Sequence, residues 1–466
     1  MVIKYLCIRS FRKRRNMDII IMGLGAVGLE LAESLSAKNG INVAVVDTNP
    51  QKVEEAVDKF DVLGVVGNGV TYEALKEAGI DRTEILIATT SQDELNILCC
   101  IMGKKFGAKT TIARISESEY FKLIGGENGL DVSLMVNPQH EAAMEISRII
   151  RFPSAIKVDR FSEGKVELIE FKVPEKSPLA GVILKELPHK FKNKVLVCAA
   201  TRDDNAVIPS GEFVIESGDH LFVTATRQEV TAFFKELGLN KQSKNVLIIG
   251  GSKTATYLVE ELHRKSIHAT VIEKDLKKCE RLAELLPYAT IIHGDGTNQK
   301  LLREEGIEWA DAFVALGDSD EQNIIMSMFA KSVAVPKIIT KIDQIDYYKM
   351  LQTSGIDSVV STKTSTADQI MRFVRNFGKK GNMVRLFSII DEKAEAIEFV
   401  ASNKFRKLGV PLMELHLKKD LIVAGIIRKG KLITPSGKDC ILEGDNVIIV
   451  TMCEGLQYLN DIFDSY

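Results

Sequence analysis

Short runs of apolar, often β-branched residues alternate along the chain with segments in which apolar residues recur at helical spacing. Five such runs occur in the first 115 residues, separated by stretches such as "GLELAESLSA" and "YEALKEAG". Strands that alternate with helices in this way predict a parallel sheet with helices on both faces. The predicted strands are residues 18–23, 42–47, 62–67, 85–90 and 110–115.

The same pattern occurs a second time further along the chain. Six pairs of positions match at a constant offset of 227 residues, and chance would align only one or two such pairs. The pairs are Gly23 with Gly250, Gly67 with Gly294, Gly79–Ile80 with Gly306–Ile307, Asp93 with Asp320, Asn96 with Asn323, and Arg114 with Lys341.

A looser match follows each of the two alternating segments. Residues 208–226 parallel residues 433–451, and Gly218–Asp219 falls on Gly444–Asp445 at an offset of 226. Strands with a period of two, joined by Gly-Asp and Pro-Ser-Gly turns, predict a small and mostly antiparallel α+β module. The chain is therefore expected to hold two α/β domains, each followed by a small α+β domain.

The order of the repeats predicts the domain boundaries, which we place near residues 151–153 and in the polar stretch 238–245. The first sixteen residues hold a basic cluster but lack the apolar core and cleavage site of a signal peptide. We interpret them as a disordered tail or as a start codon placed too early, with a weak membrane-surface patch as the alternative. The predicted division is 1–16, 17–137, 152–237, 244–362 and 382–464.

Composition narrows the classes of function. The 466 residues include 61 basic and 63 acidic side chains, so net charge does not favour a nucleic-acid partner, and we expect none. Seven cysteines without C-x-x-C spacing are typical of a reducing, cytosolic setting. No apolar run approaches the roughly 20 residues of a spanning helix. We therefore predict a soluble, cytoplasmic protein.

A glycine turn follows the first predicted strand. Gly23, Gly25 and Gly28 form a G-x-G-x-x-G motif before a helix, which lets the backbone approach a pyrophosphate at the helix N-terminus. Asp47 ends the second predicted strand, where Rossmann-like domains place an acid that binds the adenosine ribose. Because an acid there repels a ribose 2′-phosphate, NAD(H) is preferred over NADP(H). The candidate turn consists of Gly23, Leu24, Gly25, Ala26, Val27 and Gly28.

The ends of the other predicted strands supply further candidates, because ligands of open parallel sheets bind at the carboxyl edge. These candidates are Asn68, Gly69, Thr89, Thr90 and Arg114. Structural explanations stay open for all of them and for Asp47. They are a plain turn at Asn68–Gly69, a helix cap at Ser91 or Asp93, an exposed Arg114, and a strand-end Asp47 beside the helix cap Asn49–Pro50.

The second glycine turn is altered. Gly250 and Gly251 are followed by Ser252 at the middle glycine position and by Ala255 at the third. A side chain at the middle position crowds the pyrophosphate approach, whereas alanine at the third position is often tolerated. Lys253 adds a cation beside the expected phosphates.

Other features of a nucleotide site persist in this second copy. Glu273 keeps the ribose acid, and "HGDGT" keeps Asp295, Gly296 and Thr297. A different nucleotide, ATP or ADP, is one prediction for this site. A vestigial domain that only pairs with its neighbour is the alternative.

We find no catalytic set in the sequence. A dehydrogenase needs a group that moves a proton and usually a separate substrate domain. Seven histidines form no cluster of metal-ligand spacing, and neither Tyr-x-x-x-Lys nor G-x-S-x-G occurs. A ligand sensor, which shifts a conformational equilibrium by differential affinity, explains the duplicated plan better. An NAD-dependent oxidoreductase and a ligand-free scaffold remain the alternatives.

These motifs together resemble the TrkA family, the cytosolic regulatory subunits of bacterial Trk potassium-uptake systems. The resemblance covers residues 17 to about 460 and rests on "IIIMGLGAVG", "VVDTNPQKV", "GNGV" and "ATTSQDELN", repeated as "VLIIGGSKTA", "VIEKDLKKC", "IIHGDGTNQ" and "ALGDSDEQN". It implies two RCK (regulating conductance of potassium) modules, each a Rossmann-like parallel-sheet domain followed by a small α+β domain.

The resemblance also implies function. RCK modules of this family bind nucleotides and assemble into a ring, expected here as a homotetramer, beneath a membrane-embedded TrkH/TrkG-like potassium-transport subunit at the inner face of the membrane. In gated relatives a basic residue inside the glycine turn meets a terminal phosphate, and here Ala26 and Lys253 occupy that position. We therefore expect NAD(H) in the first site and ATP or ADP in the second. Binding of cyclic di-AMP to the α+β domains stays undecided.

Overall fold

The computed structural model describes most of the chain, and the predicted tail at residues 1–16 lies outside the described residues. The described residues divide into two compact units, residues 17–138 with 369–371, and residues 139–368 with 372–464. The described ranges are 17–37, 41–117, 119–121, 132–152, 154–203, 205–239, 243–344, 347, 351, 354–356, 358–377, 383–390, 393–453 and 456–464.

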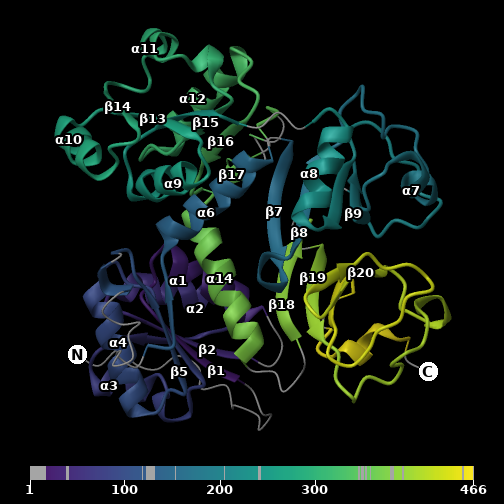
Figure 1. Ribbon diagram of the computed structural model, residues 1–466. Helices are drawn as coiled ribbons and strands as arrows, with labels where there is room; N and C mark the ends of the chain where they lie inside the picture. The colour runs from purple at the N-terminus through teal and green to yellow at the C-terminus, as the bar shows by residue number, and fades with distance from the viewer. Residues whose placement is uncertain are drawn as a thin grey trace. The chain divides into compact units, whose positions relative to one another are not determined.

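The first unit contains the first predicted α/β domain (Figure 1, purple to blue). Within the described residues its sheet has six strands in the order β3-β2-β1-β4-β5-β6, and all neighbours are parallel. The strands are β1 (Met17–Met22), β2 (Ile41–Asp47), β3 (Leu63–Val66), β4 (Ile85–Ala88), β5 (Thr110–Arg114) and β6 (Leu134–Val136). The helices are α1 (Ala26–Ser36), α2 (Pro50–Lys59), α3 (Tyr72–Glu77), η1 (Ile80–Arg82) and α4 (Asp93–Phe106).

The apolar runs form the central strands because helices cover this sheet. Ile20 and Leu86, on the neighbouring strands β1 and β4, are each no more than 1% exposed. Helices α1 and α2 pack on strands β1 to β3, and α4 packs on β4 and β5. Continuous apolar strands are expected where both faces of a parallel sheet are buried. The predicted α/β class is confirmed.

The second unit repeats this sheet with the order β14-β13-β12-β15-β16-β17, again all parallel among the described residues. The strands are β12 (Asn245–Ile249), β13 (His268–Glu273), β14 (Thr290–His293), β15 (Ala312–Ala315), β16 (Ile338–Lys341) and β17 (Ser358–Val360). The helices are α9 (Lys253–Arg264), α10 (Leu276–Leu285), α11 (Gln299–Glu304), η4 (Ile307–Trp309) and α12 (Asp320–Ser332).

Helix α6 (Pro138–Arg151) follows the first sheet in sequence but packs on the second. Its apolar residues Ile146 and Ile150 join one core with Leu258 and Leu262 of α9. Figure 1 shows α6 close beneath α9. This helix was not predicted from the sequence, and the sheet that it covers depends on contacts between segments more than a hundred residues apart.

Two small antiparallel sheets complete the second unit, as predicted. The first has the order β10-β9-β11-β8-β7 and the second the order β18-β19-β22-β20-β21. The first contains β7 (Ala155–Phe161), β8 (Val166–Lys172), β9 (Leu196–Arg202), β10 (Asn205–Val207) and β11 (His220–Ala225), with η2 (Ser162–Gly164), η3 (Leu184–Glu186), α7 (Leu187–Lys190) and α8 (Arg227–Glu236). The second contains β18 (Met383–Ile389), β19 (Ala394–Val400), β20 (Leu421–Arg428), β21 (Lys431–Ile433) and β22 (Asn446–Thr451), preceded by α14 (Thr362–Phe377), with η5 (Leu412–Glu414) and η6 (Leu459–Ile462).

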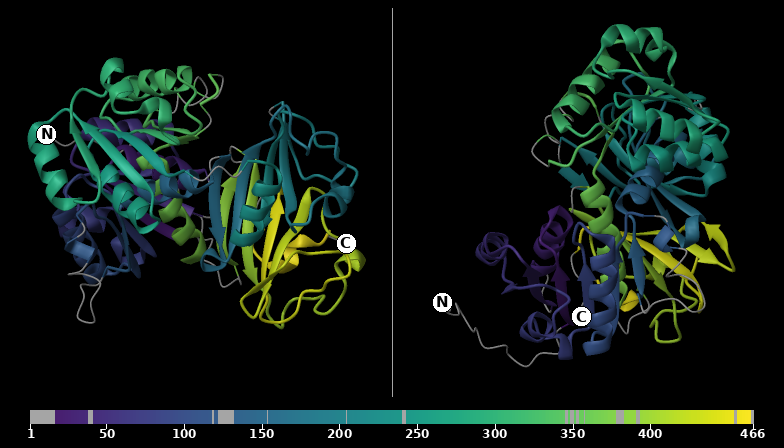
Figure 2. Two further views of the ribbon diagram at one scale, coloured as in Figure 1. Left: turned by 45° about the horizontal axis from the view of Figure 1, so that its top comes forward. Right: turned by 90° about the vertical axis from the view of Figure 1, so that its left-hand side faces the viewer.

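The two small sheets share one apolar core. Phe161 of the first lies edge-on to Phe387 of the second, with ring centroids 4.7 Å apart. The Thr224 hydroxyl donates a hydrogen bond of 2.7 Å to the Ala424 carbonyl across the same interface. Figure 2 shows the teal and yellow sheets in contact. The two α+β domains therefore form a single packed pair.

A buried carboxylate fixes this pair. Glu398 is fully buried and accepts hydrogen bonds from the backbone N–H of Ser162 at 3.1 Å and from its hydroxyl at 2.5 Å. The Asn446 amide donates a third bond of 2.6 Å. Because Ser162 belongs to the first α+β domain, directly after β7, and Glu398 to β19 of the second, these bonds hold the two domains in register.

Replacing Glu398 with alanine should destabilise the pair. The change leaves buried donors on Ser162 and Asn446 without an acceptor, which costs about 1–3 kcal/mol. Urea unfolding followed by fluorescence measures the effect. Glu395→Ala, on the same strand with a half-buried side chain, is the matched control and should change the midpoint little. Equal midpoints for the two variants would contradict the assignment.

Candidate functional site

The first glycine turn is held by the acid at the end of β2. The Leu24 N–H donates to Asp47 Oδ2 at 2.7 Å, and the Asn49 N–H donates to Asp47 Oδ1 at 2.8 Å. Asn49 in turn caps α2 by accepting from the Gln51 N–H at 2.9 Å, with Pro50 in the first turn. Asp47 is therefore a strand-end acid beside a helix cap, which is the structural explanation given from the sequence. Each carboxylate oxygen still has a second lone pair, so a ribose hydroxyl can bind as well.

The three glycines of this turn meet different surroundings. Gly23 has a φ of +91°, and a Cβ there would lie 2.9 Å from the Thr90 backbone. A Cβ at Gly28 would overlap the Gly23 carbonyl oxygen. A Cβ at Gly25, in contrast, meets nothing within 4 Å. The turn is thus closed on the protein side and open only at its middle glycine.

Helix α1 begins at this open position. Gly25 is its N-cap and provides no side-chain hydrogen bond, so the first N–H groups of Ala26, Val27 and Gly28 have no side-chain acceptor from the cap. The first turn of the helix also has no acidic residue. A helix N-terminus of this kind favours an anion through its N–H groups and its dipole.

The polar residues after β4 support the turn. The buried Thr89 hydroxyl donates to the Gly23 carbonyl at 3.0 Å. Asn96 accepts from the Thr90 N–H at 2.8 Å and donates to the Arg114 carbonyl at 2.8 Å. The Arg114 guanidinium donates to the Thr90 carbonyl at 3.0 Å, and burial lowers its pKa. Arg114 is thus half-buried against the strand ends, contrary to the exposed alternative.

Two other sequence candidates also have structural partners. The Asn68 side chain accepts from the Val70 N–H at 3.2 Å, and a Cβ at Gly69 would lie 2.8 Å from Met22 Sδ. Both observations fit the plain turn. Asp93 does not cap a helix with its carboxylate, which instead accepts from the backbone N–H groups of residues 116 and 117 at 2.8 Å each.

The second glycine turn is held in the same way, by the acid at the end of β13. Gly251 N–H donates to Glu273 Oε2 at 2.6 Å, and Asp275 N–H donates to Glu273 Oε1 at 2.9 Å. Ser252 caps α9, since its hydroxyl accepts from the Ala255 N–H at 3.4 Å. One donor that would meet a phosphate in the first turn is therefore already bound to a side chain here.

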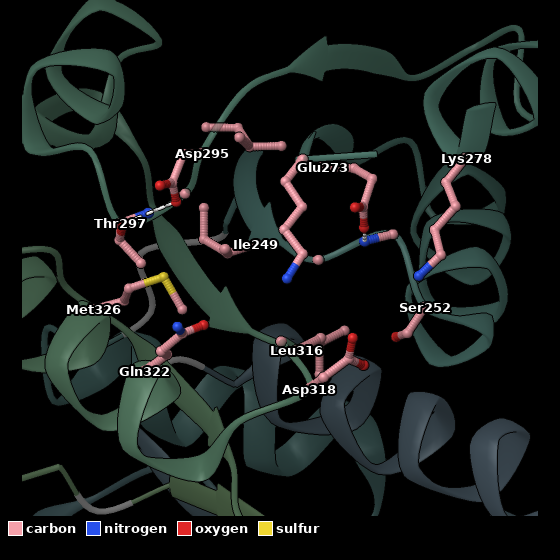
Figure 3. A pocket seen from close by; sticks show the side chains of 16 residues that line it. Ile249, Ser252, Glu273, Lys278, Asp295, Thr297, Leu316, Asp318, Gln322 and Met326 are labelled. Carbon is pink, nitrogen blue, oxygen red and sulfur yellow. Dashed lines mark hydrogen bonds between the residues drawn. The ribbon is translucent and has the colours of Figure 1, made fainter. Parts of the chain in front are cut away.

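A groove opens in front of this second turn (Figure 3). It brings together Gly250, Gly251, Ser252 and Glu273 with Asp295, Gly296 and Thr297, all of which are candidates from the sequence. Asp295 accepts from the Thr297 N–H at 2.9 Å and from its hydroxyl at 2.8 Å, and these bonds lower the pKa of Asp295. Lys253 lies exposed at the start of α9 and is not among the residues that line the groove in the described structure.

The groove is also lined by four polar side chains that were not predicted from the sequence. Lys274 directly follows Glu273, and Lys278 lies in the first turn of α10. In Figure 3 the Lys278 ammonium extends toward Ser252, and Asp318 lies on the opposite side of the groove. Gln322 comes from α12. The repeat identifies candidate site residues only at positions that the two copies share. Residues that occur only in the second copy could therefore not be identified in this way.

Two general properties bear on the function. None of the helices in the described part of the chain has the length and apolar content needed to cross a membrane. Among the same residues, no three side chains of His, Cys, Asp or Glu gather in an arrangement suited to a metal ion.

Comparison with known proteins gives the family. The TrkA-N domain model matches residues 19–138 and 246–362, and the TrkA-C domain model matches residues 168–238. The chain belongs to the TrkA family. It is 33% identical over 457 residues to the Trk system potassium uptake protein TrkA homolog 1 of Methanosarcina mazei, covering 96% of this chain and 100% of the relative. It is 32% identical to TrkA of Halomonas elongata, covering 93% and 95%.

Solved structures share the fold of this TrkA-family chain. The GsuK RCK domain superposes with a TM-score of 0.62 at 16% identity, covering 96% of this chain and 95% of that one. The GsuK channel bound to NAD gives a TM-score of 0.62 at 16% identity, covering 95% and 78%. The resemblance to tandem RCK modules inferred from the motifs is confirmed.

The crowding at Gly28 predicts a stability effect. Gly28→Ala should force the turn away from Asp47 and destabilise the first unit by about 1–3 kcal/mol, as overpacking does. Gly25→Ala is the control, because its Cβ enters open space and should change stability by less than about 0.5 kcal/mol. Urea unfolding measures both variants, and an unaffected Gly28→Ala protein would show that the third glycine is dispensable.

Proposed function

We propose that this chain is the nucleotide-sensing regulatory subunit of a potassium-uptake system. Nucleotide binding would control ion flow through a membrane-embedded, TrkH/TrkG-like potassium-transport subunit. The observation that carries the proposal is the open first glycine turn. Its N-cap residue, Gly25, makes no side-chain hydrogen bond and has open space beside it, and the neighbouring Leu24 N–H is bound to the carboxylate of Asp47. Membership of the TrkA family, whose curated members are named for potassium uptake, supplies the physiological context.

NAD(H) is the ligand we assign to the first site. All three glycines are present, so the backbone can approach a pyrophosphate. Asp47 has lone pairs left for the adenosine ribose, and its charge disfavours a 2′-phosphate. The GsuK channel, which shares the fold, is described as bound to NAD.

ATP or ADP is the ligand we assign to the second site. Ser252 narrows the approach to the helix N-terminus, which disfavours a bridging pyrophosphate. Lys274 and Lys278 line the groove, and Lys253 lies at its helix, so a terminal phosphate has cations nearby. Asp295 and Thr297 lie at the same edge, where polar groups of a nucleotide would contact them.

The assembly we propose follows from the family. Copies of the chain would form a ring, expected as a homotetramer, on the cytoplasmic side of the transport subunit. The shared core of the two α+β domains packs them together within each copy. Nucleotide binding would then change the shape of the ring without chemical change in the ligand, whereas an oxidoreductase would consume NADH.

Calorimetry on the full chain tests the first site. Asp47→Ala removes both the proposed ribose acceptor and the hydrogen bond that holds the Leu24 N–H. It should weaken NADH binding about ten- to one-hundred-fold. Gly25→Val keeps the hydrogen bond between Leu24 and Asp47 but places a side chain in the open space where the pyrophosphate would approach. It should abolish NADH binding. Asp58→Ala, at an exposed position of α2, is the control. ATP binding should persist in all three variants. NADH affinity that is unchanged in the Asp47 and Gly25 variants would show that the site lies elsewhere.

Ion flux tests the function itself. The chain should co-purify with a membrane potassium-transport subunit, and rubidium flux into vesicles holding that subunit should change when NADH is added with the protein. The Gly25→Val protein should bind the vesicles but give no NADH response. NADH consumed in proportion to an organic compound, with flux unaffected, would instead support the oxidoreductase.

A further inference from the structure

Basic side chains gather inside the second unit, away from the glycine turn of that unit. Arg148 and Arg151 come from the end of α6, Arg160 from β7, Arg227 from the start of α8 and Lys265 from the residue after α9. Figure 1 shows α6 between α9 and the β7–α8 region. We call these five residues the basic junction. It lies at the end of α9 opposite the groove, about 18 Å away along a twelve-residue helix.

The charges of the junction act on one another. Burial is the main cause that lowers the pKa of Arg151, and the nearby charges of Arg227 and Arg160 lower it further. Burial also lowers the pKa of Lys265, with further lowering by Arg151 and Arg160. Burial likewise lowers the pKa of Arg160, and the charges of Arg148 and Arg227 lower it further, so the five cations lie near one another.

Carboxylates balance only part of this charge. Glu167, 1% exposed, pairs with Arg151 and lies 3.6 Å from Arg160 Nε through the same oxygen, Oε1. Glu261 pairs with Lys265 at 3.0 Å and also with Arg264 at 3.3 Å. Glu145, near Arg148, bonds to Ser365 instead, and burial raises its pKa. The described residues thus leave the junction with surplus positive charge.

Several buried polar atoms of the junction lack partners among the described residues. They are Nε and NH1 of Arg151, Nε of Arg148, and Oε2 of Glu167. Unpaired buried atoms of this kind cost free energy and often mark the place of an ion or water. Here the unpaired atoms are donors on two arginines together with one acceptor on a carboxylate.

We propose that the basic junction binds a phosphate group that carries one proton, either free monohydrogen phosphate or a singly protonated phosphomonoester. Its anionic oxygens accept from guanidinium groups, whose planar donors suit such geometry. Its O–H donates to Glu167 Oε2, which no other group in the described structure satisfies. Sulfate, which carries no proton at neutral pH, would meet that carboxylate with repulsion. The group enters past Arg160, whose side chain is 37% exposed, and past the exposed Arg227.

A phosphate here would link two domains. Arg160 and Arg227 belong to the first α+β domain, whereas Lys265 follows α9 of the second parallel-sheet domain. The bound group neutralises the repulsion between them and so favours their contact. The site is independent of the nucleotide assignment, because none of its residues lies in a glycine turn.

Calorimetry on the full chain, with inorganic phosphate as the titrant, tests the proposal. Wild-type protein should bind phosphate, and sulfate at equal ionic strength should compete at least ten-fold more weakly. The double variant Arg160→Gln/Arg227→Gln should lose at least ten-fold in phosphate affinity. Arg406→Gln, an exposed arginine of the second α+β domain, is the control and should bind like wild type. Circular dichroism without phosphate checks that the variants are folded.

Glu167→Gln provides a second readout, because its amide can donate to sulfate and should bring the two affinities within a factor of three. Glycerol 3-phosphate distinguishes a phosphomonoester from free phosphate by which of them binds more tightly. Absence of phosphate binding to the wild type, equal binding of sulfate, or unchanged affinity in the folded double variant would each overturn the proposal.

Discussion

A single carboxylate in each parallel-sheet domain fixes the geometry on which the site depends. Asp47 and Glu273 each accept one hydrogen bond from an N–H of the glycine turn. Each accepts a second from the N–H of the residue two positions after itself, Asn49 or Asp275. The bonds tie the first β-α connection to the end of the neighbouring strand. Because the helix begins at this connection, its N-terminus is aimed at the carboxyl edge of the sheet, where an anion can bind.

The two copies differ where a ligand would contact them. The open space at Gly25 faces a helix start without a side-chain cap, whereas Ser252 caps its own helix. Outside the turn, Asn96 and Asn323 bridge the ends of neighbouring strands in the same way. Duplication has thus kept the bonds that hold the sheet edge, and it has altered the groups that a nucleotide bound there would meet.

The second unit joins segments that are distant in sequence. Helix α6 supplies core residues to the second parallel sheet, and the two α+β domains share an apolar core fixed by Glu398. The basic junction lies where α6 meets both kinds of domain. These interfaces therefore adjoin one another within the second unit.

The sequence by itself determined five of the six strands of the first parallel sheet, the duplicated plan, the glycine turns and the acids Asp47 and Glu273, whereas the short edge strand β6 was not predicted. These depend on local periodicity and turn chemistry, and the repeat displays them twice. Tertiary structure decided that α6 covers the second sheet, that the Asp93 carboxylate binds the loop after β5, and that Lys274 and Lys278 line a groove. Such contacts join segments whose separation in sequence carries no periodic signal, so only the folded chain brings them together.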